Sequence, residues 1–199
     1  MLGLLSIVIA YLLGAIPFGF LLVKFTKGTD VRAAGSGNIG ATNVLRTTGR
    51  AEGAATLLLD IAKGFTAVWI AAKLTDDSSL WMSLAAIAVM AGHAFPVFLQ
   101  FKGGKAVASF IGSFLYLTPI PLAMALLLFV AVVARTKHIS AGSIMAAGAF
   151  PFGVWMILHP PFEVTVAAFI AGGFIVYRHS SNIRRLRAGT ENVFAWKKP

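Results

Sequence analysis

Residues 2–23 read LGLLSIVIAYLLGAIPFGFLLV, a run of apolar and small residues without a single charged side chain. A helix that crosses a lipid bilayer needs about 20 mostly apolar residues, so this stretch predicts a membrane span. The whole chain agrees with it: 58% of the 199 residues are hydrophobic and 12% are charged, whereas soluble domains carry about 25% charged residues. We therefore expect an all-α integral membrane protein.

The other apolar stretches are of two kinds. One stretch, at 106–134, is too long for a simple span and is interrupted by Pro119 and Pro121. One long span or two short ones fit its length, with a re-entrant pair as the alternative to two crossings. Basic residues flank both of its ends, and basic loops face the cytoplasm, so two short or tilted helices with a turn at 118–121 are favoured. Stretches of ordinary span length are found at 54–74, 80–101, 139–158 and 162–177.

The spans add up to about seven helices, some of them short or broken, in a single polytopic membrane domain at 1–199. The N-terminus is expected outside and the C-terminus in the cytoplasm. This orientation places nearly all of the 17 lysine and arginine residues on the inside, apart from Lys63 within a span and Lys73 outside. The net charge of +10 therefore indicates membrane topology, and no nucleic-acid partner is expected.

The polar loop at 24–53 contains the sequence GSGNIGATN at 35–43, followed by Arg46. Its glycines let backbone N–H groups converge on an anion, and its hydroxyl, amide and guanidinium groups add further donors. We interpret the loop as a phosphate cradle, with a flexible connection between helices as the alternative. The literal GxGxxG within it indicates a dinucleotide site only after a β-strand, so that interpretation is rejected.

A second cluster reads GHAFP at 92–96 and FKGGK at 101–105. Pro96 should bend or locally unwind the third span near its cytoplasmic end. His93 lies one or two turns inside that face and needs a polar partner, in either a structural or a catalytic role. The KGGK sequence resembles a phosphate-binding turn, although it lacks P-loop spacing, and Lys102 also suits a membrane anchor.

Three further features have both a structural and a functional interpretation. Asp60 and Lys63 share one helix face and can pair there, and a buried structural pair is favoured over catalysis. Ser143 lies in the first turn of a span, where a hydroxyl can contact an anion or serve in packing. The tail reads RHSSNIRRLRAGTEN at 178–192, and the arginines within 184–187 are expected to contact anionic lipid headgroups.

Several familiar catalytic devices are absent from the sequence. The chain has no cysteine, which excludes thiolate catalysis and Cys-ligated zinc. It has no GxSxG nucleophile elbow, no HExxH zinc helix, no HxxxxD pair and no cluster of Asp, Glu and His. We therefore expect no cofactor and no metal, and a reaction that depends on binding, orientation and electrostatics.

Three segments together resemble the PlsY family, the bacterial acyl-phosphate:glycerol-3-phosphate acyltransferases. They are GSGNIGATNVLRTTG at 35–49, GHAFPVFLQFKGGKAVAS at 92–109 and RHSSNIRRLRAGTEN at 178–192. The family usually reads GGKGVAT where this chain has GGKAVAS, and it often has a lysine at the place of Val193.

The resemblance implies a seven-span enzyme of the bacterial inner membrane, with its active site on the cytoplasmic side. Such an enzyme moves a fatty acyl group from acyl phosphate to the 1-position of glycerol 3-phosphate, giving lysophosphatidic acid and phosphate. Acyl-CoA and acyl carrier protein are not direct donors in this family. The implied partners are these two substrates and the membrane lipids.

The resemblance also implies roles for individual residues. Glycerol 3-phosphate is expected to be held by Ser36, Arg46, Lys105, Ser143, His179 and Asn182, and the acyl phosphate or its oxyanion by Asn38, Thr42, Asn43 and the glycine N–H groups. The proton acceptor is open between His93, Glu191 and a substrate phosphate oxygen, with the last favoured. The expected catalytic residues are Ser36, Asn38, His93, Lys105 and His179; the expected substrate-binding residues are Gly35, Gly37, Gly40, Thr42, Asn43, Arg46, Lys102, Gly103, Gly104, Ser143, Arg178, Asn182 and Glu191.

A membrane transporter of a phosphorylated metabolite is the alternative function. It would also need an anion site and several spans, but transporters place that site near the bilayer midplane. Here the motifs gather at the expected cytoplasmic face, and the outward loops are short, which favours the enzyme. A non-catalytic partner in lipid synthesis is a second alternative.

Overall fold

The computed structural model describes residues 1–194, and every regular element among them is a helix. The predicted all-α fold is therefore confirmed. The helices form two compact units, residues 1–117 and residues 118–199, and the single membrane domain stays a prediction.

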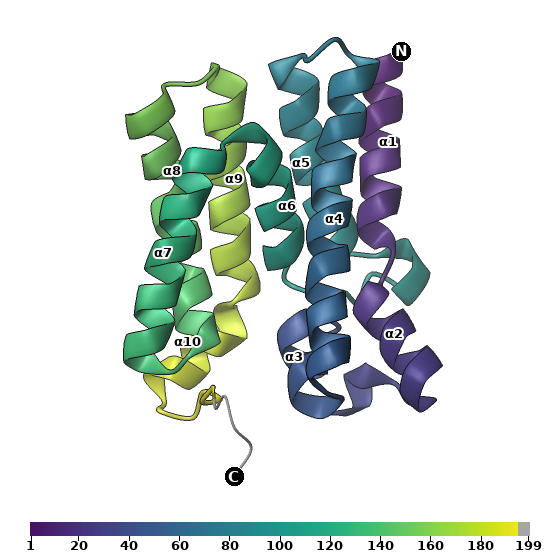
Figure 1. Cartoon of the computed structure of the whole chain (residues 1–199), viewed down its shortest axis with the longest axis vertical. Coiled ribbons are helices and arrows are strands. Elements are labelled where there is room, and N and C mark those ends of the chain that lie inside the picture. Colours follow the sequence, from purple (N-terminus) through teal and green to yellow (C-terminus); the bar gives the residue numbers. More distant parts are fainter. Residues whose placement is uncertain (195–199) are drawn as a thin grey trace. The chain divides into compact units, whose positions relative to one another are not determined.

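The first unit has a long central helix surrounded by shorter ones. Figure 1 shows the start of α1 and the α4–α5 turn at one end of this unit, and α2 and α3 at the other. The central helix is α4, against which α1, α5 and α6 pack. The elements of this unit are α1 (Leu2–Ala15), α2 (Phe18–Lys27), η1 (Val31–Ala33), α3 (Ala41–Thr47), α4 (Arg50–Leu74), α5 (Ser79–Ala94), η2 (Val97–Leu99) and α6 (Val107–Leu117).

Small residues bring the helices of the first unit into backbone contact. A Cβ at Gly14 on α1 would overlap the Val89 carbonyl group of α5, and a Cβ at Gly64 on α4 would overlap the Ser109 carbonyl group of α6. Close approach at small residues is the usual way in which helices associate in lipid, where apolar burial gives little driving force. The buried cluster between these helices accordingly consists of Ala10, Ala67, Ala71, Ala85 and Val89.

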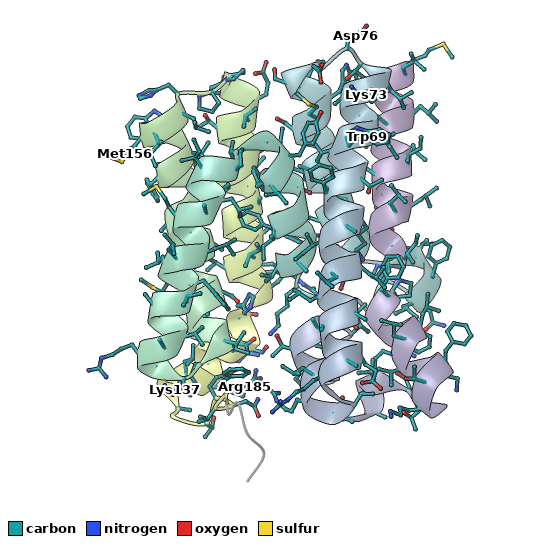
Figure 2. All side chains as sticks on the ribbon, in the orientation of Figure 1. Trp69, Lys73, Asp76, Lys137, Met156 and Arg185 are labelled. Atoms are coloured by element: carbon teal, nitrogen blue, oxygen red, sulfur yellow. The ribbon has the colours of Figure 1, made fainter. Side chains whose placement is uncertain are left out.

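In the second unit, α8 packs against both α7 and α9, and the short α10 contacts the ends of α8 and α9. Figure 2 shows Lys137 and Arg185 at the end that carries α10, whereas Met156 lies toward the α8–α9 connection. The helices of this unit are α7 (Pro119–Thr136), α8 (Ile139–Leu158), α9 (Phe162–Arg178) and α10 (Ser180–Arg187).

The surface of the helices is strongly apolar. Leu58, Leu127 and Met156 are 66%, 71% and 67% exposed, as expected for side chains that face lipid.

Not every helix is long enough to cross a membrane. Because α6 has only 11 residues, it reaches about 16 Å, roughly half the thickness of the hydrocarbon core. The count of seven crossings and the orientation of the termini stay predictions. Five stretches of the described residues are long and apolar enough to cross a membrane: Leu2–Lys27, Arg50–Leu74, Ser79–Leu99, Pro119–Thr136 and Ile139–Leu158.

Proline positions explain where the helices follow the sequence predictions and where they depart from them. The stretch at 106–134 forms two helices, as predicted, but only α6, with 11 residues, is short. The predicted turn at 118–121 is reduced to Thr118, because Pro119 and Pro121 fit the first turn of the 18-residue α7. The helix that was expected to bend near Pro96 ends at Ala94. The first stretch is broken between α1 and α2, because Pro17 has no N–H to donate and keeps Ile16 extended. The loop at 24–53 also contains η1 and α3.

Candidate functional site

Asn43 organises the glycine-rich loop of the first unit. Its buried side chain accepts a hydrogen bond from the Ser36 N–H at 2.9 Å through Oδ1. Its Nδ2 group donates to the carbonyl oxygens of Val31, Ala34 and Asn38 at 3.2, 3.1 and 2.9 Å. The loop is therefore wrapped around one amide, which favours the cradle over a flexible connection.

The glycines allow the chain to pass this close to Asn43. Gly35 and Gly37 have φ values of 61° and 69°, a region that favours glycine. A Cβ at Gly35 would overlap the Asn43 side-chain oxygen. The Gly40 N–H donates to Asn38 Oδ1 at 2.9 Å, which closes the turn just before α3.

The donors predicted for a phosphate remain accessible around this loop. Ser36 is exposed, and so are Thr42 and Arg46, which lie one turn apart on α3. Asn38 is half-buried. The loop thus has a fixed backbone and outward hydroxyl and guanidinium groups, an arrangement that suits an anion.

An apolar cluster ties the glycine-rich loop to the segment that precedes the KGGK turn. Ile39 and Val44 of the loop pack in one buried group with Leu99 of η2. Val23 of α2 and Val31 of η1 complete this group. Two of the three predicted motifs are therefore held by one core at the same end of the first unit.

The KGGK turn is built against His93, at the end of α5. The Gly104 N–H donates to the His93 carbonyl oxygen at 3.0 Å, and a Cβ at Gly104 would overlap the imidazole. The backbone then turns at Ala106, which has a φ of 62°. Lys105 is half-buried between these two residues, whereas Lys102 is exposed.

The buried pair predicted for Asp60 and Lys63 is confirmed. Lys63 Nζ lies 2.8 Å from Asp60 Oδ1, and the two side chains are 3% and 2% exposed. The same carboxylate oxygen lies 3.5 Å from His93 Nδ1. Asp60 is therefore the polar partner that His93 was expected to need.

In the second unit, Glu191 gathers three donors. Ser140 Oγ donates to its Oε1 at 3.0 Å, Asn182 Nδ2 to the same oxygen at 2.8 Å, and Arg185 Nε to Oε2 at 2.8 Å. Burial alone raises the pKa of the Glu191 carboxyl, but the hydrogen bonds from Asn182, Ser140 and Arg185 outweigh it and hold this pKa below its ordinary value of 4.5. A carboxylate so well satisfied is a poor proton acceptor.

The remaining candidates of the second unit lie at the same end of its helices. His179 is buried, and its Nδ1 lies 2.8 Å from the Ile175 carbonyl oxygen. Because a carbonyl oxygen only accepts, Nδ1 carries the proton and Nε2 is the acceptor of the neutral ring. Ser143 Oγ donates to the Ile139 carbonyl oxygen at 3.0 Å, as a packing serine does. Arg178 is half-buried.

Two contacts in the tail were not predicted from the sequence. Arg185, expected at the lipid headgroups, forms an ion pair with Glu191, because the turn at Gly189 brings the carboxylate back to it. The Phe194 N–H donates to the Lys137 carbonyl oxygen at 2.7 Å, so the tail is fastened to the α7–α8 turn. The hydrogen bond from Ser140 to Glu191 was not predicted either, because the two residues are 51 positions apart and no sequence motif links them.

The candidate residues thus form one group in each unit. Ser36, Asn38, Thr42, Asn43, Arg46, His93, Lys102 and Lys105 lie in the first unit together with Gly35, Gly37, Gly40, Gly103 and Gly104; Ser143, Arg178, His179, Asn182 and Glu191 lie in the second. Among residues 1–194, no three His, Cys, Asp or Glu side chains are grouped as a metal site.

Comparison with known proteins finds one family throughout. The family model described as glycerol-3-phosphate acyltransferase matches residues 4–189. The chain is 45% identical over 190 residues to the glycerol-3-phosphate acyltransferase of Desulforamulus reducens, covering 95% of this chain and 94% of the relative. It is 47% identical over 186 residues to that of Geobacter sulfurreducens, covering 94% of each chain.

Solved structures agree with the sequence relatives. The crystal structure of PlsY, an integral membrane glycerol 3-phosphate acyltransferase, in its glycerol 3-phosphate form has a TM-score of 0.91 at 36% identity, covering 97% of this chain and 96% of that one. The lysophosphatidic acid form of PlsY has a TM-score of 0.89 at 36% identity, covering 97% and 95%. With its polar loops and apolar helices, the chain therefore belongs to the glycerol-3-phosphate acyltransferase family of integral membrane enzymes.

Proposed function

We propose that this acyltransferase takes its acyl group from an acyl phosphate and transfers it to the 1-hydroxyl of glycerol 3-phosphate. The products would be lysophosphatidic acid and inorganic phosphate. The observation that carries the proposal is the rigid glycine-rich loop around Asn43, which presents Ser36, Thr42 and Arg46 outward. Both substrates bear a phosphate group, and both need such donors.

In the proposed reaction the 1-hydroxyl oxygen attacks the carbonyl carbon of the acyl phosphate. A C–O bond forms, the carbonyl oxygen becomes an oxyanion, and the bond to the phosphate oxygen then breaks. Phosphate is a good leaving group, so no covalent enzyme intermediate is required. The hydroxyl proton goes to a substrate phosphate oxygen, since Glu191 already accepts three hydrogen bonds and His93 is buried beside Asp60.

The roles proposed for the first unit follow from exposure and charge. Ser36, Arg46 and Lys105 would hold the phosphate of glycerol 3-phosphate through charged and hydroxyl donors. Asn38, Thr42 and the loop N–H groups would hold the donor phosphate and the oxyanion. The contacts predicted between glycerol 3-phosphate and Ser143, His179 and Asn182 of the second unit are separate predictions.

The location of the enzyme also follows from its charges. We propose that the end of the first unit bearing α2 and α3 faces the cytoplasm of a bacterial inner membrane. Lys24, Lys27, Arg32 and Arg46 lie in this part of the chain, in keeping with the positive-inside rule.

The donor is tested with purified protein, glycerol 3-phosphate and a synthetic acyl phosphate. Phosphate release and lysophosphatidic acid formation should rise together, one for one. Acyl-CoA, offered at the same concentration, should give no product. Transfer from acyl-CoA without transfer from acyl phosphate would overturn the proposed donor. Glycerol 3-phosphate flux into proteoliposomes without acyl transfer would favour the transporter alternative.

A further inference from the structure

The buried pair of Asp60 and Lys63 is fastened to the break between α1 and α2. Lys63 Nζ donates to the carbonyl oxygens of Gly14 and Ile16, each at 2.9 Å, in addition to its contact with Asp60. These carbonyl groups lie at the end of α1, where helix geometry leaves the last carbonyl oxygens without i+4 donors, and the Ile16 oxygen also accepts the Phe18 N–H at 3.1 Å. The ammonium thus donates two hydrogen bonds to the main chain at the break and forms an ion pair with the Asp60 carboxylate.

That carboxylate faces His93, which in turn faces the KGGK turn. His93 is 4% exposed, and its Nδ1 lies 3.5 Å from Asp60 Oδ1. The other ring nitrogen, Nε2, lies against Gly104, where a Cβ would overlap it. The main chain of His93 also accepts the Gly104 N–H at 3.0 Å.

Gly103 packs equally closely against this helix end. A Cβ there would overlap the His93 carbonyl oxygen and the ring of Pro96. The two residues that precede Lys105 thus take their position from the side chain and the backbone of His93. Rotation of the imidazole would displace the backbone of Gly104, and with it the starting point of the Lys105 side chain.

We propose that Asp60, held by Lys63, is a positioning residue for acyl transfer, because it orients the imidazole of His93 and so fixes the turn that presents Lys105. The proposal rests on the phosphate contact proposed above for Lys105. Asp60 itself touches no substrate in this mechanism. Its effect must therefore pass through Lys105, which separates it from a general loss of stability.

The test uses the double variant Asp60→Asn/Lys63→Met in the full-length protein. Removing one member of a buried ion pair leaves an uncompensated charge, whereas removing both leaves none. The double variant leaves no buried charge, but it also removes the two hydrogen bonds from Lys63 to the Gly14 and Ile16 carbonyl groups, so its melting temperature in detergent should fall less than that of Asp60→Asn alone. The double variant's dissociation constant for glycerol 3-phosphate, measured by titration calorimetry, should rise about tenfold.

Ser113→Ala is the matched control. Ser113 is also buried in the first unit, and its hydroxyl donates to the carbonyl oxygens of Gly64 and Ser109 without touching Asp60. This variant should bind glycerol 3-phosphate as the wild type does. The single variant Asp60→Asn is carried alongside, so that a double variant that fails to fold leaves a second measurement of the lost carboxylate.

Combination with Lys105→Ala decides whether Asp60 acts through Lys105. Effects of residues that act through one another are not additive, so the triple variant should bind no more weakly than Lys105→Ala alone. Full additivity, or wild-type affinity in both Asp60 variants, overturns the positioning role while leaving the proposed function intact. Wild-type affinity in Lys105→Ala overturns both the phosphate contact and the positioning role.

Discussion

Lys105 is half-buried, and it lies between Gly104, which packs against His93, and Ala106, which has a φ of 62°. We predict that Lys105→Ala lowers kcat/KM for glycerol 3-phosphate, because a charged phosphate contact is lost. The loss should correspond to about 2–5 kcal/mol of transition-state stabilisation. Steady-state kinetics measure this loss. Lys73→Ala is the control, since Lys73 is exposed and is not among the candidate site residues; comparable losses in both variants would contradict a specific contact.

Glu191 gives a prediction on stability against pH. Its pKa is lowered when folded, so its contribution is complete above the ordinary value of 4.5 and is lost as the pH falls through the lowered value. Near neutral pH, Glu191→Gln should cost about 1–3 kcal/mol. Melting temperatures taken from pH 7 down to pH 3 should converge for wild type and variant, and parallel curves would show that the carboxylate does not stabilise the fold.

The sequence could identify candidate site residues by their chemical type, but it could not predict which groups they contact. Asn43 was predicted to bind the acyl phosphate from its place among glycines, and its side chain is engaged with four backbone groups of the same loop. Glu191 was a candidate base, and three donors surround it. Such contacts depend on how the loop closes and on the approach of distant residues, which composition does not contain.

At the scale of elements, the loop from η1 to α3 depends on the side-chain amide of Asn43. Asn43→Ala removes its four hydrogen bonds, each worth about 1 kcal/mol, and should lower kcat/KM for the acyl donor at least about tenfold. Asn43→Asp keeps the acceptor for the Ser36 N–H, but it turns a carboxylate oxygen toward the three carbonyl oxygens to which the amide donates, so it should lose at least as much. Thr47→Val removes the bond to the Asn43 carbonyl oxygen and a contact with the Thr48 hydroxyl but leaves the Asn43 side chain in place, so it should stay near wild type.

Elements bounded by proline were the most predictable. The turn before α7 and the end of α5 both follow from proline near the boundary. The break at Pro17 was missed, because hydropathy over 2–23 is continuous and only the missing N–H marks the interruption. Its stabilising contact comes from Lys63, 47 residues away from Ile16.

Ala106 explains one departure from the family pattern. The usual glycine suits its φ of 62°, and alanine there costs about 1 kcal/mol. The buried methyl group returns about 0.8 kcal/mol. The two effects nearly cancel, so the turn tolerates alanine.

At the scale of the whole molecule, the orientation in the membrane gives the remaining prediction. The chain has no cysteine, so any maleimide labelling of a single-cysteine variant comes from the introduced residue. Lys73→Cys should react with a membrane-impermeant maleimide in intact cells, whereas Lys27→Cys should react only after the membrane is opened. The reverse labelling would invert the topology and place the glycine-rich loop outside the cytoplasm.

Composition predicted the class of the molecule because lipid demands apolar surfaces everywhere. It could not predict which helices approach each other closely, because hydropathy counts a glycine in a tight contact, as at Gly14 and Gly64, and one that faces lipid alike.

The three donors around Glu191 also set an order of events during synthesis. Ser140 is synthesised 51 residues before Glu191, so α8 and α9 are complete while their polar end still lacks its acceptor. A nascent chain that stops short of Glu191 would leave Ser140, Asn182 and Arg185 without that carboxylate.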